Sequence, residues 1–239
     1  MKVVLGILIG TLGLAQTPLS VEAKHDHWRR WCVGQLTVDD KGIAFESASK
    51  KGHRWRWGYL DLQQVKVLDD GEVSVLTYAD NKWRLGADRE FHFLVADKQF
   101  AAQVSPLLES RLERRFVSGL AARPGKALWE LPAKHLLRFS GSEGTLAAAE
   151  DRIVYRTDRP GESRTWLFSD IDHISKTSPD QLTITTHERA RSHYGSLKEF
   201  NFQLKQPLAE DRYDELWKRL EKSKGLQILT TAREDRHAP

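Results

Sequence analysis

The feature that most constrains this chain is an internal repeat. When the sequence is aligned with itself at an offset of about 110 residues, Ala23-Lys24-His25 meets Ala133-Lys134-His135. After a one-residue gap in the loops that follow Phe45 and Tyr155, the match continues to Leu107 and Leu216. Most matched positions are apolar, aromatic or glycine: Gly34 and Gly144, Leu36 and Leu146, Ile43 and Ile153, Trp57 and Trp166, Phe91 and Phe200, Phe93 and Phe202. We therefore predict a duplication that gives two modules with equivalent cores.

Apolar and polar residues alternate inside each copy, as in Ile43-Ala44-Phe45 and Phe91-His92-Phe93. A period of two predicts β-strands with one buried face. Turn-forming runs such as Asp69-Asp70-Gly71 separate these strands. Each copy ends in a run with helical spacing, and Gly225 is placed to end the second helix. In the first copy Ser105-Pro106 fits a helix start, so we expect a kinked helix or two shorter ones.

Two equivalent segments carry a resemblance to a known family. Tyr59–Val65 and Phe168–Ile174 both read aromatic-x-Asp-[Leu/Ile]-x-x-[Val/Ile], and a Phe-x-Phe strand and a terminal helix follow each of them. This order resembles the pleckstrin-homology-like (PH-like) superfold, in particular bacterial PH-like and GRAM-type domains. The resemblance implies a mainly β protein with some α-helix, in which two tandem bent antiparallel sandwiches or partly open barrels are each closed by a C-terminal helix. It also implies a binding module more than an enzyme, because PH-like domains typically bind ligands.

The amino terminus has the layout of a secretory signal peptide. Lys2 precedes the apolar run Val3–Ala15, and the small-residue site Val21-Glu22-Ala23 follows. The run is shorter than the roughly 20 residues that span a bilayer as a helix. We therefore expect cleavage after Ala23 and export to the periplasm or the extracellular space, with an uncleaved anchor as the alternative.

The leader and the repeat together divide the chain. We expect a signal peptide at 1–23, a first PH-like module at 24–118, a connector at 119–132, a second PH-like module at 133–224 and a flexible tail at 225–239. Arg123-Pro124-Gly125 disfavours regular structure, so proteolysis should begin in the connector.

Charge and cysteine content limit the possible partners. The net charge is +4, and the excess of basic residues lies in segments 113–132 and 222–239 and not on either repeat. A nucleic-acid groove needs a basic stripe on a folded face, so we expect no nucleic-acid partner. Cys32 is the single cysteine, which excludes an internal disulfide, and its place in an expected strand predicts burial.

A basic hairpin with interleaved aromatic residues is the most suggestive binding element of the first copy. Its candidate ligand-binding residues are Lys50, Lys51, Arg54, Trp55 and Arg56. Arg54 and Arg56 alternate onto one face of the expected strand, where they could hold phosphate groups. The pattern resembles the basic first hairpin of inositide-binding PH domains. The alternative is a solvated strand edge whose charges discourage aggregation.

The loops Ala79–Arg89 and Glu188–Lys198 have equal length and share a central glycine. Their candidate binding residues are Lys82, Trp83 and Arg84 in the first copy and Arg191 and His193 in the second. If these loops lie beside the Lys50–Arg56 loop at the open end of each barrel, they would form a basic, aromatic rim for an anionic partner. The alternative is that they are ordinary polar hairpins.

The sequence shows no catalytic set, and we expect no cofactor and no metal site. No nucleophile elbow, phosphate loop or Ser/His/Asp arrangement is visible, and Asp61 and Asp170 occupy equivalent positions that suit turn caps. His187 and His193 lack the spacing of zinc ligands. His25 recurs as His135, which favours a structural role for that histidine over a ligand role.

Three functions follow as hypotheses. The first is an exported, non-catalytic binding or scaffolding protein of the cell envelope, whose partner is another protein or a membrane surface that it contacts peripherally. The second is a hydrolase with a cleft between the two modules, which a deep pocket with converging histidine and carboxylate side chains would favour. The third is binding of anionic lipid or glycan phosphate through the basic hairpin loops.

Overall fold

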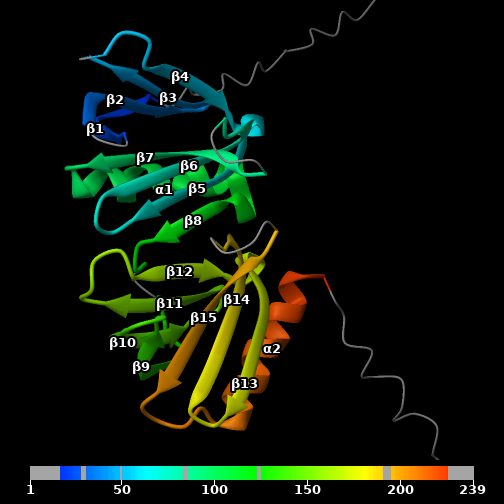
Figure 1. The fold of residues 1–239 in the computed structure, drawn as a ribbon. Helices are drawn as coiled ribbons and strands as arrows, with labels where there is room; N and C mark the ends of the chain where they lie inside the picture. Colours follow the sequence, from blue (N-terminus) through cyan, green and yellow to red (C-terminus); the bar gives the residue numbers. More distant parts are fainter. Residues whose placement is uncertain are drawn as a thin grey trace, which may run out of the picture.

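The computed structural model describes residues 17–27, 31–48, 50–82, 86–122, 125–190 and 195–225. These residues form a mainly β structure in which 15 strands join one large open sheet (Figure 1). The first half contains eight strands and one α-helix: β1 (Leu19–Asp26), β2 (Trp31–Asp39), β3 (Gly42–Ser47), β4 (Arg54–Gly58), β5 (Leu62–Leu68), β6 (Glu72–Asp80), β7 (Asp88–Val95), α1 (Lys98–Leu112) and β8 (Phe116–Gly119).

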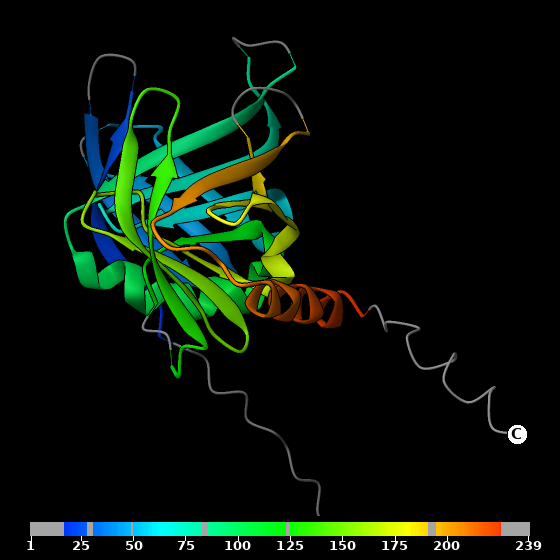
Figure 2. The same ribbon diagram turned by 90° about the horizontal axis from the view of Figure 1, so that it is seen from below.

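The second half contains seven strands and one α-helix: β9 (Trp129–Leu136), β10 (Gly141–Ala148), β11 (Arg152–Thr157), β12 (Arg164–Leu167), β13 (Ile171–Ser178), β14 (Gln181–Arg189), β15 (Leu197–Leu204) and α2 (Glu210–Ser223). Three short 3-10 helices complete the described residues: η1 (Tyr59–Asp61), η2 (Glu113–Arg115) and η3 (Phe168–Asp170). Figure 2 shows that α1 and α2 lie on the same side of the molecule.

The two halves have the same strand order. It runs β5-β6-β7-β1-β2-β3-β4 in the first half and β13-β14-β15-β9-β10-β11-β12 in the second. The register also agrees, because His25 pairs with Cys32 of β2 and Phe93 of β7, while His135 pairs with Ser142 and Phe202. Residues that the self-alignment matches therefore occupy the same places in the sheet.

Each half has its own hydrophobic cluster. The first includes Leu36, Phe45, Val65, Val75 and Phe93, and the second includes their counterparts Leu146, Tyr155, Ile174, Ile184 and Phe202. All of them are almost completely buried, as the alternating pattern predicts. Removal of this apolar surface from water is the main stabilising term for each half.

The matched glycines Gly34 and Gly144 are explained by close packing. A Cβ on Gly34 would lie 2.3 Å from the carbonyl oxygen of Glu46 and 2.7 Å from the ring of Phe45. A Cβ on Gly144 would lie 2.2 Å from the carbonyl oxygen of Arg156 and 3.0 Å from the ring of Tyr155. Only glycine lets the neighbouring strand and its aromatic ring approach this closely.

The terminal helices differ in one respect from the sequence expectation. In the first half a single helix, α1, runs through Pro106. Asp97 caps its amino-terminal end, because the Asp97 side chain accepts a hydrogen bond from Gln99 N–H. The expectation of two shorter helices is therefore wrong, and Ser105 instead donates to the carbonyl oxygen of Ala101. In the second half Gly225 follows α2 with φ 70°, which confirms its predicted place at the helix end.

The first strand begins earlier than the predicted signal-peptide cleavage site. β1 starts at Leu19, and Leu19 to Ala23 pair with Val38 to Gly34 of β2. Ala23 is 1% exposed and belongs to the first hydrophobic cluster. Cleavage after Ala23 would remove this part of the sheet, and the cleavage site stays a prediction.

β8 joins the two halves and was missed from the sequence. It pairs in parallel with β5 and, through Ser118 and Thr165, with β12 of the second half. The sequence places these residues at a module end and in a connector, because four residues carry too little periodicity to predict a strand. Part of the predicted connector, Arg123 and Pro124, lies outside the described residues.

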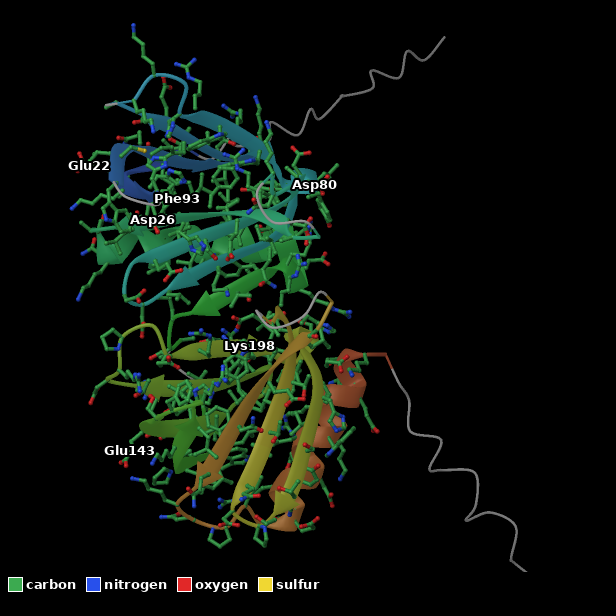
Figure 3. All side chains as sticks on the ribbon, viewed as in Figure 1. Glu22, Asp26, Asp80, Phe93, Glu143 and Lys198 are labelled. Atoms are coloured by element: carbon green, nitrogen blue, oxygen red, sulfur yellow. The ribbon has the colours of Figure 1, made fainter. Side chains whose placement is uncertain are left out.

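A buried ion network lies where the halves meet. Glu188 of β14 is 3% exposed and lies 3.0 Å from Nζ of Lys66 on β5 and 2.8 Å from Nζ of Lys198. Arg164 Nε lies 3.7 Å from the second carboxylate oxygen. Burial opposes ionisation of Glu188, but Lys198, Lys66 and Arg164 outweigh it and lower its pKa to about 2. Lys198 is labelled at this junction in Figure 3.

Candidate metal centre

Four side chains that can ligate a metal meet at one end of the first half. His25 lies on β1, Cys32 on β2, His27 directly after β1, and His53 directly before β4. His25 and Cys32 are opposite each other across the β1–β2 pair and are buried, whereas His27 and His53 are partly exposed. One ligand atom from each residue lies within 4.8 Å of the other three. We call these four residues the His/Cys cluster.

The separations in the His/Cys cluster resemble those of a four-coordinate site. His27 Nε2 lies 3.3 Å from His25 Nδ1 and 3.1 Å from Cys32 Sγ. Cys32 Sγ lies 3.8 Å from His25 Nδ1 and 3.7 Å from His53 Nδ1. In a tetrahedron with metal–nitrogen bonds of about 2.0 Å and a metal–sulfur bond of about 2.3 Å, the ligand atoms are about 3.3 to 3.6 Å apart. Four of the six separations are thus close to those around a bound ion, and all six lie within 4.8 Å.

The electrostatic surroundings favour the uncharged form of the three imidazoles. Burial, reinforced by His27 and His53, lowers the pKa of His25 to about 4. Burial and the nearby Lys50 also lower the pKa values of His27 and His53. A neutral imidazole offers a nitrogen lone pair to a metal ion, and a thiolate is the metal-binding form of cysteine. The set can thus supply three nitrogen donors and one sulfur donor.

Aromatic rings form the inner wall of the His/Cys cluster. The ring of His25 lies 4.9 Å from that of Trp55 and 5.2 Å from that of Phe93, measured between centroids. Arg89 places its guanidinium 4.5 Å from the centre of the Phe91 ring. Figure 3 labels Phe93 inside the first half and Asp26 at the end of β1. This wall fixes the buried His25 ring and leaves the His27 and His53 side of the cluster toward solvent.

The corresponding place in the second half lacks the ligand set. His135 matches His25, but Leu137, Ser142 and Glu162 stand where His27, Cys32 and His53 stand in the first half. Tyr155 donates to the carbonyl oxygen of Ser142, and the Ser142 hydroxyl lies 2.9 Å from that of Thr157. His135 Nδ1 lies 3.5 Å from Glu162 Oε2, and the contact lowers the pKa of Glu162. Hydrogen bonds thus occupy this place in the second half.

The basic hairpin of the first half is present, but much of its charge is already neutralised. Lys50 and Lys51 are exposed, while Arg54 pairs with Glu46, and Arg56 lies 2.8 Å from Asp39. Trp55 is half-buried and packs inward against His25 and Phe91. The predicted alternation of Arg54 and Arg56 against Trp55 is therefore confirmed, but both arginines make ion pairs within the protein.

The structure describes only parts of the three loops that the predicted rim requires, so the rim stays a prediction. Asp80, at the base of the Ala79–Arg89 hairpin, and Asp26, next to the His/Cys cluster, lie apart in Figure 3. The base of the Glu188–Lys198 hairpin contacts the first half, because Arg189 donates to Gln63 and Asp88 at 2.8 and 3.0 Å. Lys82 is exposed; Trp83, Arg84, Arg191 and His193 lie outside the described residues.

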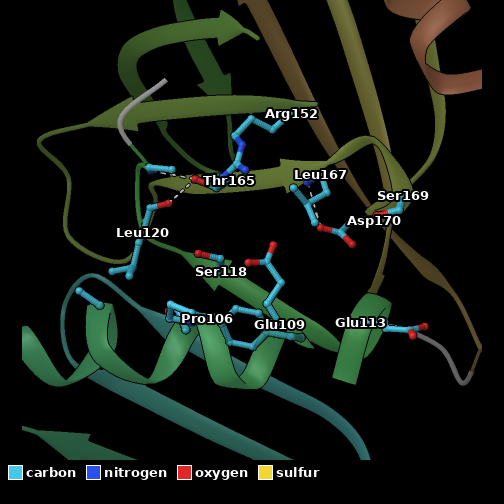
Figure 4. Close-up of a pocket in the computed structure, with 14 residues that line it drawn as sticks. Pro106, Glu109, Glu113, Ser118, Leu120, Arg152, Thr165, Leu167, Ser169 and Asp170 are labelled. Carbon is cyan, nitrogen blue, oxygen red and sulfur yellow. Dashed lines mark hydrogen bonds between the residues drawn. The ribbon is translucent and has the colours of Figure 1, made fainter. Parts of the chain in front are cut away.

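A cleft of about 330 Å³ lies between the halves (Figure 4). Its polar lining includes Glu109, Glu113, Asp170 and Arg152, and no histidine is among the described residues that line it. Burial raises the pKa of Asp170 to about 6. The cleft thus contains the carboxylates that the hydrolase hypothesis requires, but its described lining contains no histidine.

The predicted capping role of Asp61 and Asp170 is confirmed. Asp61 Oδ2 accepts from Gly58 N–H at 2.9 Å, and Asp170 Oδ2 accepts from Leu167 N–H at 3.0 Å. Asp61 and Asp170 thus accept the same backbone hydrogen bond at equivalent positions. This capping role accounts for the presence of Asp170 in the wall of the cleft. Nothing in its geometry calls for a catalytic role.

The sequence-based expectation of no metal site depended on spacing along the chain. No regular spacing along the chain relates His25 and His27 to Cys32 and His53, which come from separate elements. A usable signal was present, because His27, Cys32 and His53 all differ in type from their repeat partners Leu137, Ser142 and Glu162, whereas His25 is kept as His135. The expectation remains a prediction, and the geometry of the His/Cys cluster favours the opposite outcome.

No protein-family model and no curated protein matches the chain. Solved structures show weak similarity, with TM-scores of 0.32 and 0.33. The N-terminal PH domain of human ARAP2 is 16% identical, with 48% of this chain and 94% of that domain covered. The Spt16D Pob3N heterodimer is 9% identical, with 81% and 99% covered, and the C-terminal domain of an unknown Leishmania infantum protein is 11% identical, with 40% and 84% covered. None of the proposals below depends on this likeness.

Among the described residues, the helices α1 and α2 are both too short and too polar to cross a membrane.

Proposed function

We propose that this protein binds one transition-metal ion in the His/Cys cluster, as an exported, non-catalytic binding protein of the cell envelope. The observation that carries the proposal is the convergence of three imidazole nitrogens and one thiol within 4.8 Å. The ion we expect is Zn²⁺, because Zn²⁺ prefers four nitrogen and sulfur ligands in a tetrahedron. Cu⁺ is the competing ion, since a thiolate also suits soft monovalent copper.

A closed ligand set supports binding over catalysis. Catalytic zinc sites usually have three protein ligands and keep a fourth position for water or substrate, whereas four protein ligands fill the coordination shell. The His/Cys cluster offers four. We infer that the protein holds the ion without activating a water molecule on it.

The wider architecture of the proposal is two tandem PH-like modules, of the kind found in bacterial PH-like domain proteins. Equal strand order, equal register at His25 and His135, and two separate hydrophobic clusters support a duplication. Export also belongs to this proposal, with a cleavage site that lies before Leu19 so that β1 stays intact.

The test is a metal titration of the purified protein with its leader removed before Leu19. We expect one Zn²⁺ or Cu⁺ per chain by elemental analysis. Substitution with Co²⁺ should give an absorption band for thiolate-to-metal charge transfer, which reports the Cys32 ligand directly. Cys32→Ser should abolish that band and weaken metal binding at least 100-fold, because Ser142 shows that this substitution fits the fold.

His92→Gln is the matched control. His92 lies on the neighbouring strand β7 but pairs with Glu72 and Glu90 at 3.3 and 3.5 Å and is not part of the His/Cys cluster. We expect it to leave the stoichiometry and the charge-transfer band unchanged. Wild-type protein that binds neither ion, or that binds both equally well after Cys32→Ser, would disprove the proposed function.

A further inference from the structure

Building on the proposed function, we propose that the metal is an exchangeable cargo and not a structural element, and that a thiol-bearing acceptor removes it from the His27 and His53 side. Four observations support this proposal. The second half keeps the fold without the ligand set, and two of the four ligands are more exposed than the others. These two ligands lie just outside strands, and positively charged side chains lie near the cluster.

The second half shows that the fold does not need a metal at this place. Leu137, Ser142 and Glu162 replace three of the four ligands there, and Tyr155 and Thr157 satisfy Ser142 by hydrogen bonding. The strands around it nevertheless pair in the same register as in the first half. A structural zinc site, in contrast, supplies folding free energy that the domain cannot do without.

The four ligands fall into an inner pair and an outer pair. His25 and Cys32 are 6% and 3% exposed and are fixed by the β1–β2 pairing. His27 and His53 are partly exposed, and each lies just outside a strand. Their rings are 4.5 Å apart and together form the solvent side of the cluster. Among the described residues, this is the side from which an incoming ligand can reach the ion, while the inner pair holds it.

The charges near the His/Cys cluster weaken the binding of a dication. Three neutral imidazoles and one thiolate carry a single negative charge, so bound Zn²⁺ would leave the site positive. Arg89 and Lys50 lie close enough to act electrostatically on His53, and Asp26 is the carboxylate that acts on His27. Like charges at this range repel the ion and favour its transfer to a more anionic ligand set.

The transfer step is a ligand substitution without oxidation or reduction. A thiol of the acceptor loses its proton to water and forms a sulfur–metal bond, while the bond between the metal and His53 Nδ1 breaks. The released imidazole is neutral, so charge and electrons balance. His27 and His25 would then leave as neutral imidazoles while a second acceptor thiolate and water molecules bind the metal. Cys32 would leave last as a thiolate, which takes up a proton from water.

The experiment uses the full folded chain loaded with one Zn²⁺, a synthetic Cys-x-x-Cys peptide as acceptor, and His53→Ala as the variant. We expect the transfer rate to rise in proportion to peptide concentration and to be about tenfold faster for His53→Ala. We also expect the metal-free protein to unfold in urea with the same slope as the loaded protein, because no part of the fold is lost.

The outcomes separate this inference from the proposed function. If no metal binds at all, the proposed function is wrong and this inference falls with it. If Zn²⁺ binds at one per chain but the transfer rate does not depend on the peptide, or the metal-free protein loses β structure by circular dichroism, only the cargo inference is overturned. A Gly-x-x-Gly peptide serves as the control acceptor and should remove no metal.

Discussion

The two halves of the molecule build the same aromatic frame and use it differently. His25 packs against Phe93 and Phe45 in the first half, and His135 packs against the equivalent Phe202 and Tyr155 in the second. The first half adds His27, Cys32 and His53 around this histidine, whereas the second half adds hydrogen-bonding groups. With the same strand framework, a few residue differences therefore decide whether this place holds a set of metal ligands or a network of hydrogen bonds.

A second difference lies at the junction. Glu188 occupies the position of Ala79, and Lys198 that of Arg89. Arg89 stacks on Phe91 beside the His/Cys cluster, while Lys198 lies 4.8 Å from the centre of the equivalent Phe200 ring and pairs with Glu188. Equivalent cations over equivalent rings thus have different places in the two halves. Arg89 lies beside the His/Cys cluster, and Lys198 takes part in the contact between the halves.

The largest expected effect follows from removing the junction carboxylate. Glu188→Gln should lower the free energy of unfolding by about 3 to 5 kcal/mol, because it leaves Lys66, Lys198 and Arg164 without their buried counter-charge. Urea unfolding measures it. Glu143→Gln, which removes an exposed pair with Lys205, is the control and should leave stability unchanged. Equal stability of the two variants would show that the Glu188 network does not join the halves.

The same residue predicts a pH dependence. The pKa of Glu188 in the folded protein is about 2, below the value of about 4.3 expected in the unfolded chain. The folded state therefore binds fewer protons in this range, and the stabilisation present above about pH 4 is lost as the pH falls toward 2. Urea unfolding between pH 5 and 3 should show this loss in the wild type and a flatter profile in Glu188→Gln. Parallel profiles would contradict the assignment.

A smaller loss is expected when the first strand is shortened. β1 begins at Leu19, and β9 begins at the equivalent Trp129. A chain that starts at Lys24 therefore has a shorter first strand than its counterpart in the second half. It loses the buried Ala23, the partly buried Leu19 and Val21, and their pairing with β2. We expect about 2 to 4 kcal/mol lower stability than for a chain that starts at Thr17. If the chains that start at Lys24 and at Thr17 have equal melting curves, cleavage after Ala23 is compatible with the fold.

A graft sharpens the comparison without a large change in stability. Leu137→His, Ser142→Cys and Glu162→His together should place a second ligand set around His135, because the register of β9 and β10 equals that of β1 and β2. Elemental analysis should then give two metal ions per chain. The graft combined with Cys32→Ser should give one. A graft that folds and still binds one ion would show that strand register alone does not create the site.

The smallest effect is expected at the basic hairpin. Arg54 and Arg56 already pair with Glu46 and Asp39, so changing Lys50, Lys51, Arg54 and Arg56 to Ser should leave co-sedimentation with anionic vesicles unchanged at low and high salt. Salt-sensitive binding by the wild type that the variant lacks would favour the lipid or glycan-phosphate hypothesis instead.

Part of the candidate site was readable from the chain. Burial of Cys32, the strand position of His25 and its equivalence with His135, and the capping by Asp61 and Asp170 all follow from local pattern, and the structure agrees. The metal ligands themselves did not follow. His53 is separated from Cys32 by β2, β3 and a loop, and no spacing rule relates the two.

The sequence by itself indicated strands with one buried face and matched positions in the two halves, because alternation and repetition are local properties of the chain. Only the tertiary structure decided that β8 joins the halves, that Glu188 is buried against Lys66, and that His53 meets His25, His27 and Cys32. These contacts depend on strand register and on how loops of different lengths close over the sheet. Both are set by packing between distant segments, which single-residue patterns do not encode.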